Sequence, residues 1–220
     1  MTTPIQAILF DLDGTFADTA PDLGYAVNLM RKARNLPPVP DEKTRPVTSS
    51  GARGLLGAGF GITPDHADYP AMRDEFLNLY EANLCRETRL FDGMAQLIDT
   101  LEGRGYAWGI VTNKAERFAL PLMSQLGYGK RAGCIVGGDT TGKMKPHPDP
   151  LYAAARRLDV EPETCVYVGD DERDVQAGRA AGMKTIAVRY GYLNGSDPAV
   201  WGADVVIDRP LELLELIYRD

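Results

Sequence analysis

Six short, largely apolar runs recur along this 220-residue chain, separated by stretches with the periodicity of amphipathic helices. Each run is followed by a polar residue or a glycine, and the runs are Ala7–Phe10, Trp108–Val111, Cys134–Val136, Cys165–Val168, Thr185–Val188 and Val205–Ile207. Runs this short are typical of strands in a parallel sheet that is covered on both faces. Residues 94–101 and 151–158 repeat apolar side chains at helical spacing between them. The alternation predicts a doubly wound α/β fold with a parallel sheet.

One segment interrupts this alternation. Residues 21–86 contain helical periods and no convincing strand. Apolar residues share a helix face over 23–30 and again over 72–80, and Asp68 is a plausible N-cap for the second helix. A connection this long with apolar faces of its own is an inserted helical module rather than a loop.

Charge and cysteine content narrow the class of protein. The chain has 24 Lys and Arg against 31 Asp and Glu, a net charge of −7, and no basic stretch, so we expect no nucleic-acid partner. No apolar run approaches the length of a membrane span, and Asp11 breaks the first run, so we expect neither a membrane partner nor a secretory signal. The three cysteines form no C-x-x-C pair, which favours a reduced, cytoplasmic setting.

Two aspartates follow the first predicted strand directly. Asp11 and Asp13 are two residues apart, so in extended backbone both side chains point the same way and converge at the carboxyl end of the strand. This end is the usual binding edge of such a sheet. Carboxylates this close repel each other, which favours protonation of one or a cation between them. One could act as a nucleophile and the other as a general acid and base. Gly14 allows a sharp turn just after them.

The segment Asp11-Leu12-Asp13-Gly14-Thr15, with Asp18-Thr19 behind it, resembles the first motif of the haloacid dehalogenase superfamily, in its phosphatase branch. The resemblance implies that Asp11 attacks phosphorus to form an aspartyl-phosphate. It implies that Asp13 protonates the leaving oxygen and then activates water. It also implies a Rossmann-like core over residues 1–17 and 87–220, with an all-helical cap domain inserted at 18–86.

The second and third sites of the family pattern follow later strands. The resemblance assigns Thr112 to a hydrogen bond with a phosphoryl oxygen and places Asn113 among the substrate-binding residues. A hydroxyl beside backbone N–H groups suits an anion, although Thr-Asn is also a common strand-to-helix cap. The Lys-Pro pairing of the family selects Lys145, whose ammonium group would neutralise charge on the phosphoryl oxygens. Lys143 is the competing candidate, and a solvated basic loop is the alternative reading of both lysines.

The fourth site is acidic. Residues 170–174 hold four acidic side chains within five positions, a cluster that calls for a counter-ion. Carboxylate oxygens without soft ligands suit Mg²⁺. By resemblance, Asp170 binds the metal together with Asp11 and the main-chain carbonyl of Asp13, while Asp174 supports the site. Asp171 occupies a position where the family often has Ser, Thr or Asp. A helix N-terminus is the alternative explanation of this acidity.

Substrate choice is expected to lie in the cap. Residues 49–54 combine hydroxyls, glycines and Arg53 at a predicted helix start, an arrangement that suits an anionic or hydroxyl-rich leaving group. Arg53 is therefore our candidate for specificity, with a solvated surface arginine as the alternative.

The resemblance spans essentially the whole chain and is closest to phosphoglycolate phosphatases, with a further likeness to N-acetylmuramic acid 6-phosphate phosphatases. We predict a Mg²⁺-dependent phosphomonoester hydrolase that acts on a small phosphorylated acid or sugar, as a monomer or homodimer. A β-phosphoglucomutase-like phosphomutase and a non-enzymatic acidic binding module remain alternatives. A dehalogenase is disfavoured, because displacing a halide would leave Asp13 without a role.

Overall fold

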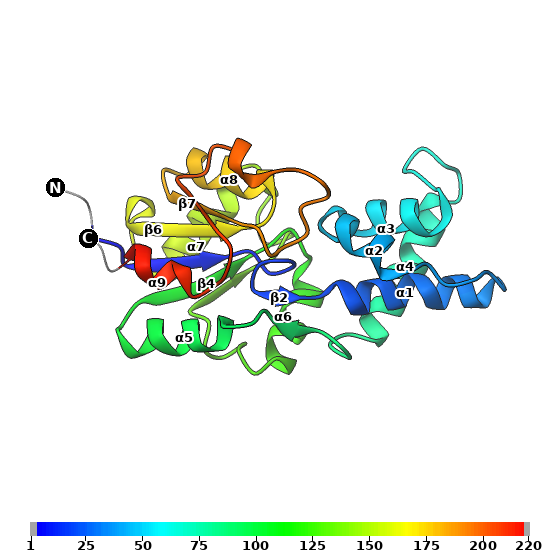
Figure 1. The fold of residues 1–220 in the computed structure, drawn as a ribbon, viewed down its shortest axis with the longest axis horizontal. Helices are drawn as coiled ribbons and strands as arrows, with labels where there is room; N and C mark the ends of the chain where they lie inside the picture. The colour runs from blue at the N-terminus through cyan, green and yellow to red at the C-terminus, as the bar shows by residue number, and fades with distance from the viewer. Residues whose placement is uncertain (1–3, 218–220) are drawn as a thin grey trace. The chain divides into compact units, whose positions relative to one another are not determined.

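A computed structural model of the protein describes residues 4–217 and is drawn in Figure 1. The chain divides into two compact units, one made of residues 1–17 and 90–220 and the other of residues 18–89. The short strands β2 (Ala17–Asp18) and β3 (Arg89–Leu90) pair where the chain passes from one unit to the other. The finer division into a core domain of 1–17 and 87–220 and a cap domain of 18–86 stays a prediction.

The first unit is built on a six-stranded sheet with the order β5-β4-β1-β6-β7-β8. Its strands are β1 (Ala7–Phe10), β4 (Ala107–Val111), β5 (Cys134–Val136), β6 (Cys165–Gly169), β7 (Lys184–Val188) and β8 (Val205–Ile207). Every pairing is parallel, and β1 is flanked by β4 and β6, with Ala7 opposite both Ala107 and Cys165. The strand order therefore reverses direction at β1. The predicted doubly wound α/β fold with an inserted helical module is confirmed.

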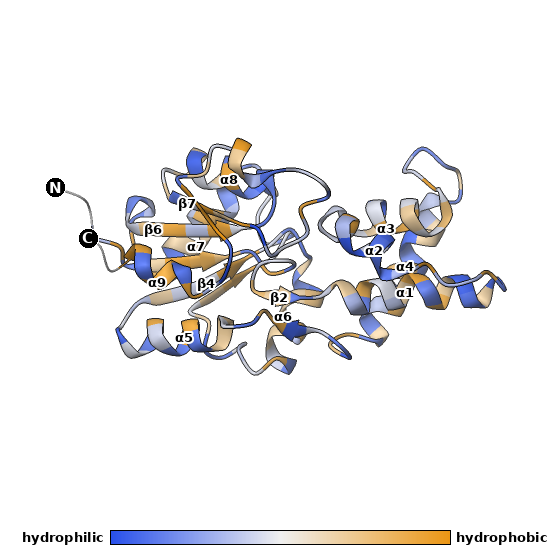
Figure 2. Ribbon diagram, viewed as in Figure 1, coloured by the Kyte–Doolittle hydropathy of each residue, from blue (hydrophilic) through white to orange (hydrophobic). Residues whose placement is uncertain are grey.

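Helices cover this sheet. They are α5 (Met94–Gly103), α6 (Glu116–Gln125), α7 (Asp149–Leu158), α8 (Glu172–Ala180) and α9 (Glu212–Ile217), with 3-10 turns at Pro162–Thr164 and Pro198–Val200. The α7 helix packs on β4 and β5, and α8 packs on β6 and β7. Figure 2 shows the strands mainly in hydrophobic colours, whereas the helices alternate between hydrophobic and hydrophilic residues. The sheet is thus the buried layer from which the polar loops at the strand ends project.

The second unit is helical. It contains α1 (Ala20–Ala33), α2 (Asp41–Thr44), a 3-10 helix (Arg45–Ser50), α3 (Gly51–Phe60) and α4 (Tyr69–Ala82). The α1 helix packs on α3 and α4, and it buries Leu23, Val27 and Met30 as the periodicity predicts. Asp68 does occupy the N-cap position of α4, but its side chain makes no capping hydrogen bond.

A buried carboxylate fastens the return segment of this helical unit. Asp22, in the first turn of α1, is fully buried. Its oxygens accept hydrogen bonds from the backbone N–H of Glu87 (2.9 Å), the backbone N–H of Thr88 (3.1 Å) and the hydroxyl of Thr88 (2.7 Å). The start of α1 and the segment that leaves α4 are therefore held together inside one unit.

Among residues 4–217, no helix combines the length and the apolar character that crossing a membrane requires.

Candidate active site

Polar side chains gather at the carboxyl ends of the central strands. Asp11 follows β1, Thr112 follows β4 and Asp170 follows β6. These three strands are neighbours at the point where the strand order reverses. In open α/β sheets this point leaves a crevice that binds ligands, so the topology alone selects this edge as the candidate site.

A buried lysine lies at the centre of the cluster. The Lys145 ammonium group is 2.8 Å from Asp11 Oδ1 and 2.7 Å from Asp174 Oδ1, and it also reaches the Val111 carbonyl oxygen (3.0 Å) and the Tyr167 hydroxyl (2.7 Å). Although burial alone would lower it, the two carboxylates raise the pKa of Lys145. Lys145 therefore carries a fixed positive charge against Asp11.

The loop that carries this lysine is held by an amide side chain. Asn113 accepts a hydrogen bond from the backbone N–H of Lys145 and donates one to its carbonyl oxygen, each at 3.0 Å. The Tyr167 hydroxyl donates to the Val111 carbonyl oxygen at 2.8 Å and lies 3.1 Å from Asp174 Oδ1. Lys145 is thus located through both its main chain and its side chain.

Three buried carboxylates form an acidic triad. Asp11, Asp170 and Asp174 each offer an oxygen within 4.8 Å of the others. Burial raises the pKa of Asp11 to about 7, because lost hydration outweighs the attraction of the Lys145 ammonium group. Burial, together with the charges of Asp11 and Asp174, raises the pKa of Asp170 well above its usual range. Burial thus disfavours the charged forms of these two carboxylates, and a cation bound between them would stabilise those forms.

Asp170 is held from two distant parts of the chain. The Thr15 hydroxyl donates to Oδ1 at 2.9 Å, and the backbone N–H of Tyr192 donates to Oδ2 at 2.7 Å. Two glycines let the backbone come this close. A Cβ on Gly14, whose φ is +90°, would lie 2.1 Å from Asp170 Oδ2, and one on Gly191 would lie 2.2 Å from Asp170 Cβ.

Asp13 has a different partner from the triad. The Lys114 ammonium group lies 2.8 Å from Asp13 Oδ1, and the two side chains are only 7% and 15% exposed. The Asp13 carboxylate does not belong to the metal-compatible triad. Its ion pair was not anticipated from the sequence.

Asp171 serves the helix that follows it. It is the N-cap of α8, where it accepts from the backbone N–H of Arg173 and takes part in a capping box with Asp174. Although burial alone would raise it, the Arg173 guanidinium group holds the pKa of Asp171 below its usual range. The proposed helix N-terminus explanation therefore accounts for this residue.

The donor set fits a divalent cation. The site contains four carboxylates and two ammonium groups, so its net formal charge is −2. The carboxylates are those of Asp11, Asp13, Asp170 and Asp174, and the ammonium groups are those of Lys114 and Lys145. The ligand atoms that the triad offers are carboxylate oxygens, the type that Mg²⁺ and Ca²⁺ prefer. Charge and ligand chemistry agree with a divalent metal site.

Comparison with known proteins identifies the family. A family model described as haloacid dehalogenase-like hydrolase matches residues 8–188, which include the triad, Lys145 and the whole helical unit. The chain belongs to the haloacid dehalogenase-like hydrolase family. The resemblance inferred from the motifs is thereby confirmed, as is the prediction of a phosphatase of this family.

Relatives of this haloacid dehalogenase-like hydrolase carry two names. The chain is 44% identical over 216 residues to the N-acetylmuramic acid 6-phosphate phosphatase of Pseudomonas aeruginosa, covering 98% of this chain and 96% of that protein. It is 47% identical over 211 residues to the phosphoglycolate phosphatase of Xanthomonas campestris, covering 96% and 95%. The crystal structure of a predicted phosphoglycolate phosphatase from Haemophilus somnus superimposes with a TM-score of 0.86, at 26% identity and with 98% and 99% coverage.

The structure gathers most of the predicted site residues of this hydrolase in one place. Asp11, Lys145, Asp170 and Asp174 contact one another or share the triad. The Thr112 hydroxyl lies at the same edge, where it accepts from the backbone N–H of Lys114 at 3.1 Å. Asn113 contacts the main chain of Lys145. Their roles in catalysis stay predictions.

Two further candidates have exposed side chains. Lys143 is exposed, with its ammonium group 3.0 Å from His147 Nε2, whereas Lys145 contacts Asp11. Arg53 is exposed in the first turn of α3, in the helical unit.

The contributors that were missed include Lys114, Tyr167 and Tyr192. Lys114 directly follows Thr112-Asn113 at a sheet edge rich in carboxylates, and this position could have indicated it. A tyrosine inside a buried strand needs a partner for its hydroxyl, which was a signal for the second. Tyr192 acts through its backbone N–H, and no side-chain pattern reveals such a contact.

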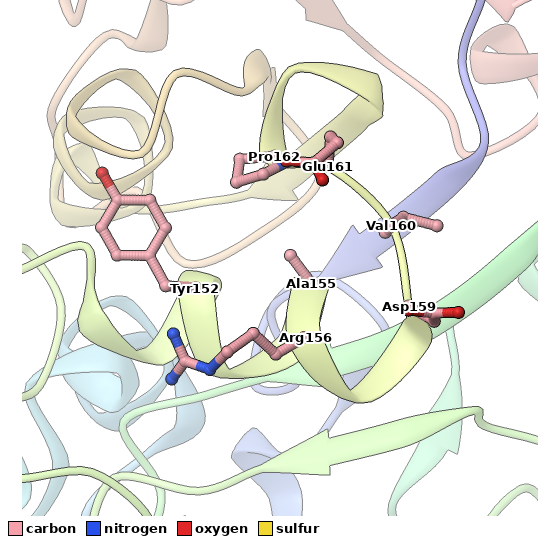
Figure 3. Close-up of a pocket in the computed structure, with 7 residues that line it drawn as sticks. All are labelled: Tyr152, Ala155, Arg156, Asp159, Val160, Glu161 and Pro162. Atoms are coloured by element: carbon pink, nitrogen blue, oxygen red, sulfur yellow. The ribbon is translucent and has the colours of Figure 1, made fainter.

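The hollow in Figure 3 is separate from this site. It is lined by Tyr152, Ala155, Arg156, Asp159, Val160, Glu161 and Pro162. These residues belong to the last turns of α7 and the segment that leads into β6, at the opposite end of that strand from Asp170. None of them belongs to the acidic triad, so this hollow is not the active site.

Proposed function

We propose that the protein hydrolyses a small phosphorylated metabolite with the help of Mg²⁺, through an aspartyl-phosphate on Asp11. The observation that carries the proposal is the setting of Asp11: a buried carboxylate at the reversal of the strand order, 2.8 Å from a buried ammonium group and grouped with two further buried carboxylates. Nucleophilic attack by a carboxylate on a phosphate dianion needs nearby positive charge, because the two reactants repel each other; the Lys145 ammonium group supplies part of it and a cation held by the carboxylates would supply the rest.

The metal would be held by Asp11, Asp170 and the main-chain carbonyl of Asp13, with Asp174 in support through its contacts with Lys145 and the backbone N–H of Asp171. When bound, Mg²⁺ supplies charge neutralisation to the phosphoryl oxygens. The hydrogen bonds from Thr15 and Tyr192 fix the Asp170 carboxylate in place for this task.

In the proposed reaction, an Asp11 oxygen forms a bond to phosphorus while the bond from phosphorus to the leaving oxygen breaks. Asp13 gives its proton to that oxygen, and the alcohol departs. Asp13 then accepts a proton from a water molecule whose oxygen attacks the aspartyl-phosphate, which releases inorganic phosphate and restores the Asp11 carboxylate. Lys145 and Thr112 bind the phosphoryl oxygens throughout.

The substrate class follows from the relatives named above. We favour phosphoglycolate, with N-acetylmuramic acid 6-phosphate or another sugar phosphate as the second candidate, since both phosphatases resemble the chain over nearly its whole length. Arg53 is the proposed specificity residue, because a guanidinium group at a helix start suits a carboxylate or a hydroxyl-rich leaving group. The cytoplasmic location and the monomeric or dimeric state stay predictions.

A phosphate-release assay tests this proposal. We expect wild-type protein to release phosphate from phosphorylated acids or sugars in a panel that also contains nucleotides, and to do so only with Mg²⁺. Asp11→Asn should lower turnover by at least about 10³-fold, because an amide oxygen is a poor nucleophile, while leaving thermal unfolding unchanged.

Three outcomes would contradict the proposal or part of it. Equal phosphate release by wild type and Asp11→Asn would remove Asp11 from the chemistry. Conversion of a sugar phosphate to its isomer without free phosphate would identify a phosphomutase. A preference for nucleoside monophosphates would overturn the substrate class.

A further inference from the structure

The proposed mechanism uses Asp13 twice, yet Asp13 lies outside the acidic triad. Its carboxylate pairs with Lys114, whose ammonium group lies 2.8 Å from Asp13 Oδ1. The side chains are 7% and 15% exposed, so little water competes with the pair. Ion pairs on open surfaces contribute little to fixing a side chain, whereas a pair this protected holds its geometry.

Lys114 is itself fixed to the sheet. It follows β4, and its backbone N–H donates to the Thr112 hydroxyl at 3.1 Å. Its carbonyl oxygen accepts from the backbone N–H of Gly138 at 2.8 Å. The main chain is therefore anchored on both sides of the peptide, and the side chain extends from a rigid base toward the loop that follows the neighbouring strand β1.

The two buried lysines serve different carboxylates. Lys145 contacts Asp11 and Asp174, whereas Lys114 contacts Asp13. Lys114 is thus positioned to act on the second aspartate of the pair.

We propose that Lys114 is a positioning residue that orients the Asp13 carboxylate for proton transfer to the leaving oxygen. The inference rests on the proposed function, in which Asp13 is the general acid. An aspartate has two rotatable side-chain bonds, and a general acid must lie within hydrogen-bond reach of the oxygen that it protonates. The hydrogen bond from the ammonium group to Oδ1 restricts both rotations and is kept when the proton resides on Oδ2, so the direction of the oxygen that transfers the proton is set.

This role predicts a dependence on the leaving group. A p-nitrophenolate departs without needing a proton, whereas an alkoxide needs one from the general acid. Lys114→Met should therefore lower kcat/KM, which reports the steps up to departure of the leaving group, by about 10²-fold or more for the best alkyl phosphate of the panel, the usual contribution of general acid catalysis. For p-nitrophenyl phosphate, kcat/KM should fall by less than about tenfold. Breakdown of the aspartyl-phosphate, which both substrates share, does not enter this comparison.

Two further variants complete the test. Lys114→Arg keeps the positive charge and should retain a ratio of the two kcat/KM values close to that of wild type. Lys143→Met removes an exposed lysine that pairs with His147, and it should leave both rates unchanged. If Lys114→Met fails to unfold cooperatively, Lys114→Gln replaces it, because the amide keeps a hydrogen-bond donor while removing the charge.

Equal losses on both substrates, or no loss on either, would overturn the positioning role. A similar rise in KM for both substrates with unchanged kcat would instead make Lys114 a substrate-binding residue and also overturn it. Failure of the proposed function gives a different result, since wild-type protein would then release phosphate from neither substrate or Asp11→Asn would remain active.

Discussion

At the scale of single residues, the site depends on how closely backbone and carboxylate approach. Asp170 receives hydrogen bonds from Thr15 and Tyr192, and these contacts require Gly14 and Gly191 to pass directly against it. A side chain at either glycine would occupy the space of the Asp170 carboxylate. The glycine of the first motif is therefore needed for the packing around Asp170 as well as for the turn.

Gly14→Ala tests this requirement. The new Cβ would lie 2.1 Å from Asp170 Oδ2, at a φ of +90° that disfavours any side chain, so Asp170 must shift. We expect phosphatase kcat/KM to fall by at least about tenfold, because misplaced ligands weaken a metal site by 10- to 100-fold, and the Mg²⁺ concentration for half-maximal activity to rise.

Gly103→Ala is the matched control. Gly103 is the last residue of α5, and a Cβ there meets no atom within 4 Å. This variant should keep full activity and gain up to about 1 kcal/mol in urea unfolding, because alanine reduces the entropy of the unfolded chain. Wild-type activity and Mg²⁺ response in Gly14→Ala would refute the packing argument.

At this scale, the sequence predicts those site residues whose side-chain type and spacing form a recognisable motif. Asp11, Lys145, Asp170 and Asp174 were predicted from motifs, and the structure brings them together. Contacts made by the backbone, such as the N–H of Tyr192 on Asp170, depend on how a loop folds back, which no residue pattern encodes. Lys114 could have been named as a candidate from its place after Thr112-Asn113, but its contact with Asp13 depends on β1 lying beside β4, which the sequence does not show.

At the scale of elements, the carboxyl ends of the strands position the site, and the first turn of α1 is joined by hydrogen bonds to residues 87–88 of the same helical unit. Each of the six apolar runs forms a strand, because a strand buried on both faces leaves an apolar pattern in the sequence. The two-residue strands β2 and β3 were not predicted, since two residues carry no periodicity. Asp22 was also not singled out, although its carboxylate joins α1 to the segment at residues 87–88.

Asp22→Ala should destabilise the helical unit. The change removes the acceptor of three hydrogen bonds in a fully buried place and leaves their donors, on Glu87 and Thr88, without it. Unsatisfied buried donors are expensive, so we expect a loss of about 2 to 4 kcal/mol in urea unfolding. Asp74→Ala, which removes an exposed carboxylate from α4, should change stability by less than about 0.5 kcal/mol. Equal stability of the two variants would show that Asp22 is not a fastening point.

At the scale of the whole molecule, part of the negative net charge of the chain is gathered at one site. The net charge of −7 argued against nucleic acid as a partner. Three of the acidic side chains converge in the triad, two of them with raised pKa values, so folding brings together negative charges that are separated in the unfolded chain. A cation that binds this arrangement favours the folded state as a whole.

Mg²⁺ should therefore stabilise the protein against unfolding. At a free concentration 100 times the dissociation constant, linkage predicts a gain of about 2.7 kcal/mol, seen as a higher Tm that EDTA reverses. Asp170→Asn should largely abolish the Mg²⁺-dependent shift, because it removes one carboxylate of the triad. The metal assignment fails if Mg²⁺ leaves the Tm of wild type unchanged or shifts both proteins equally.

The central place of β1 has a consequence for how the chain folds during its synthesis. Ala7 pairs with Ala107 on one side and with Cys165 on the other, so β1 leaves the ribosome long before either neighbour exists. An all-apolar strand must then wait with both edges open, a state prone to aggregation until β6 has been made. The helical unit, which spans residues 18–89, has left the ribosome much earlier. We therefore expect the helical unit to fold while β1 still lacks a partner strand. Asp11, which follows β1, gains its contact with Lys145 only once residue 145 has left the ribosome.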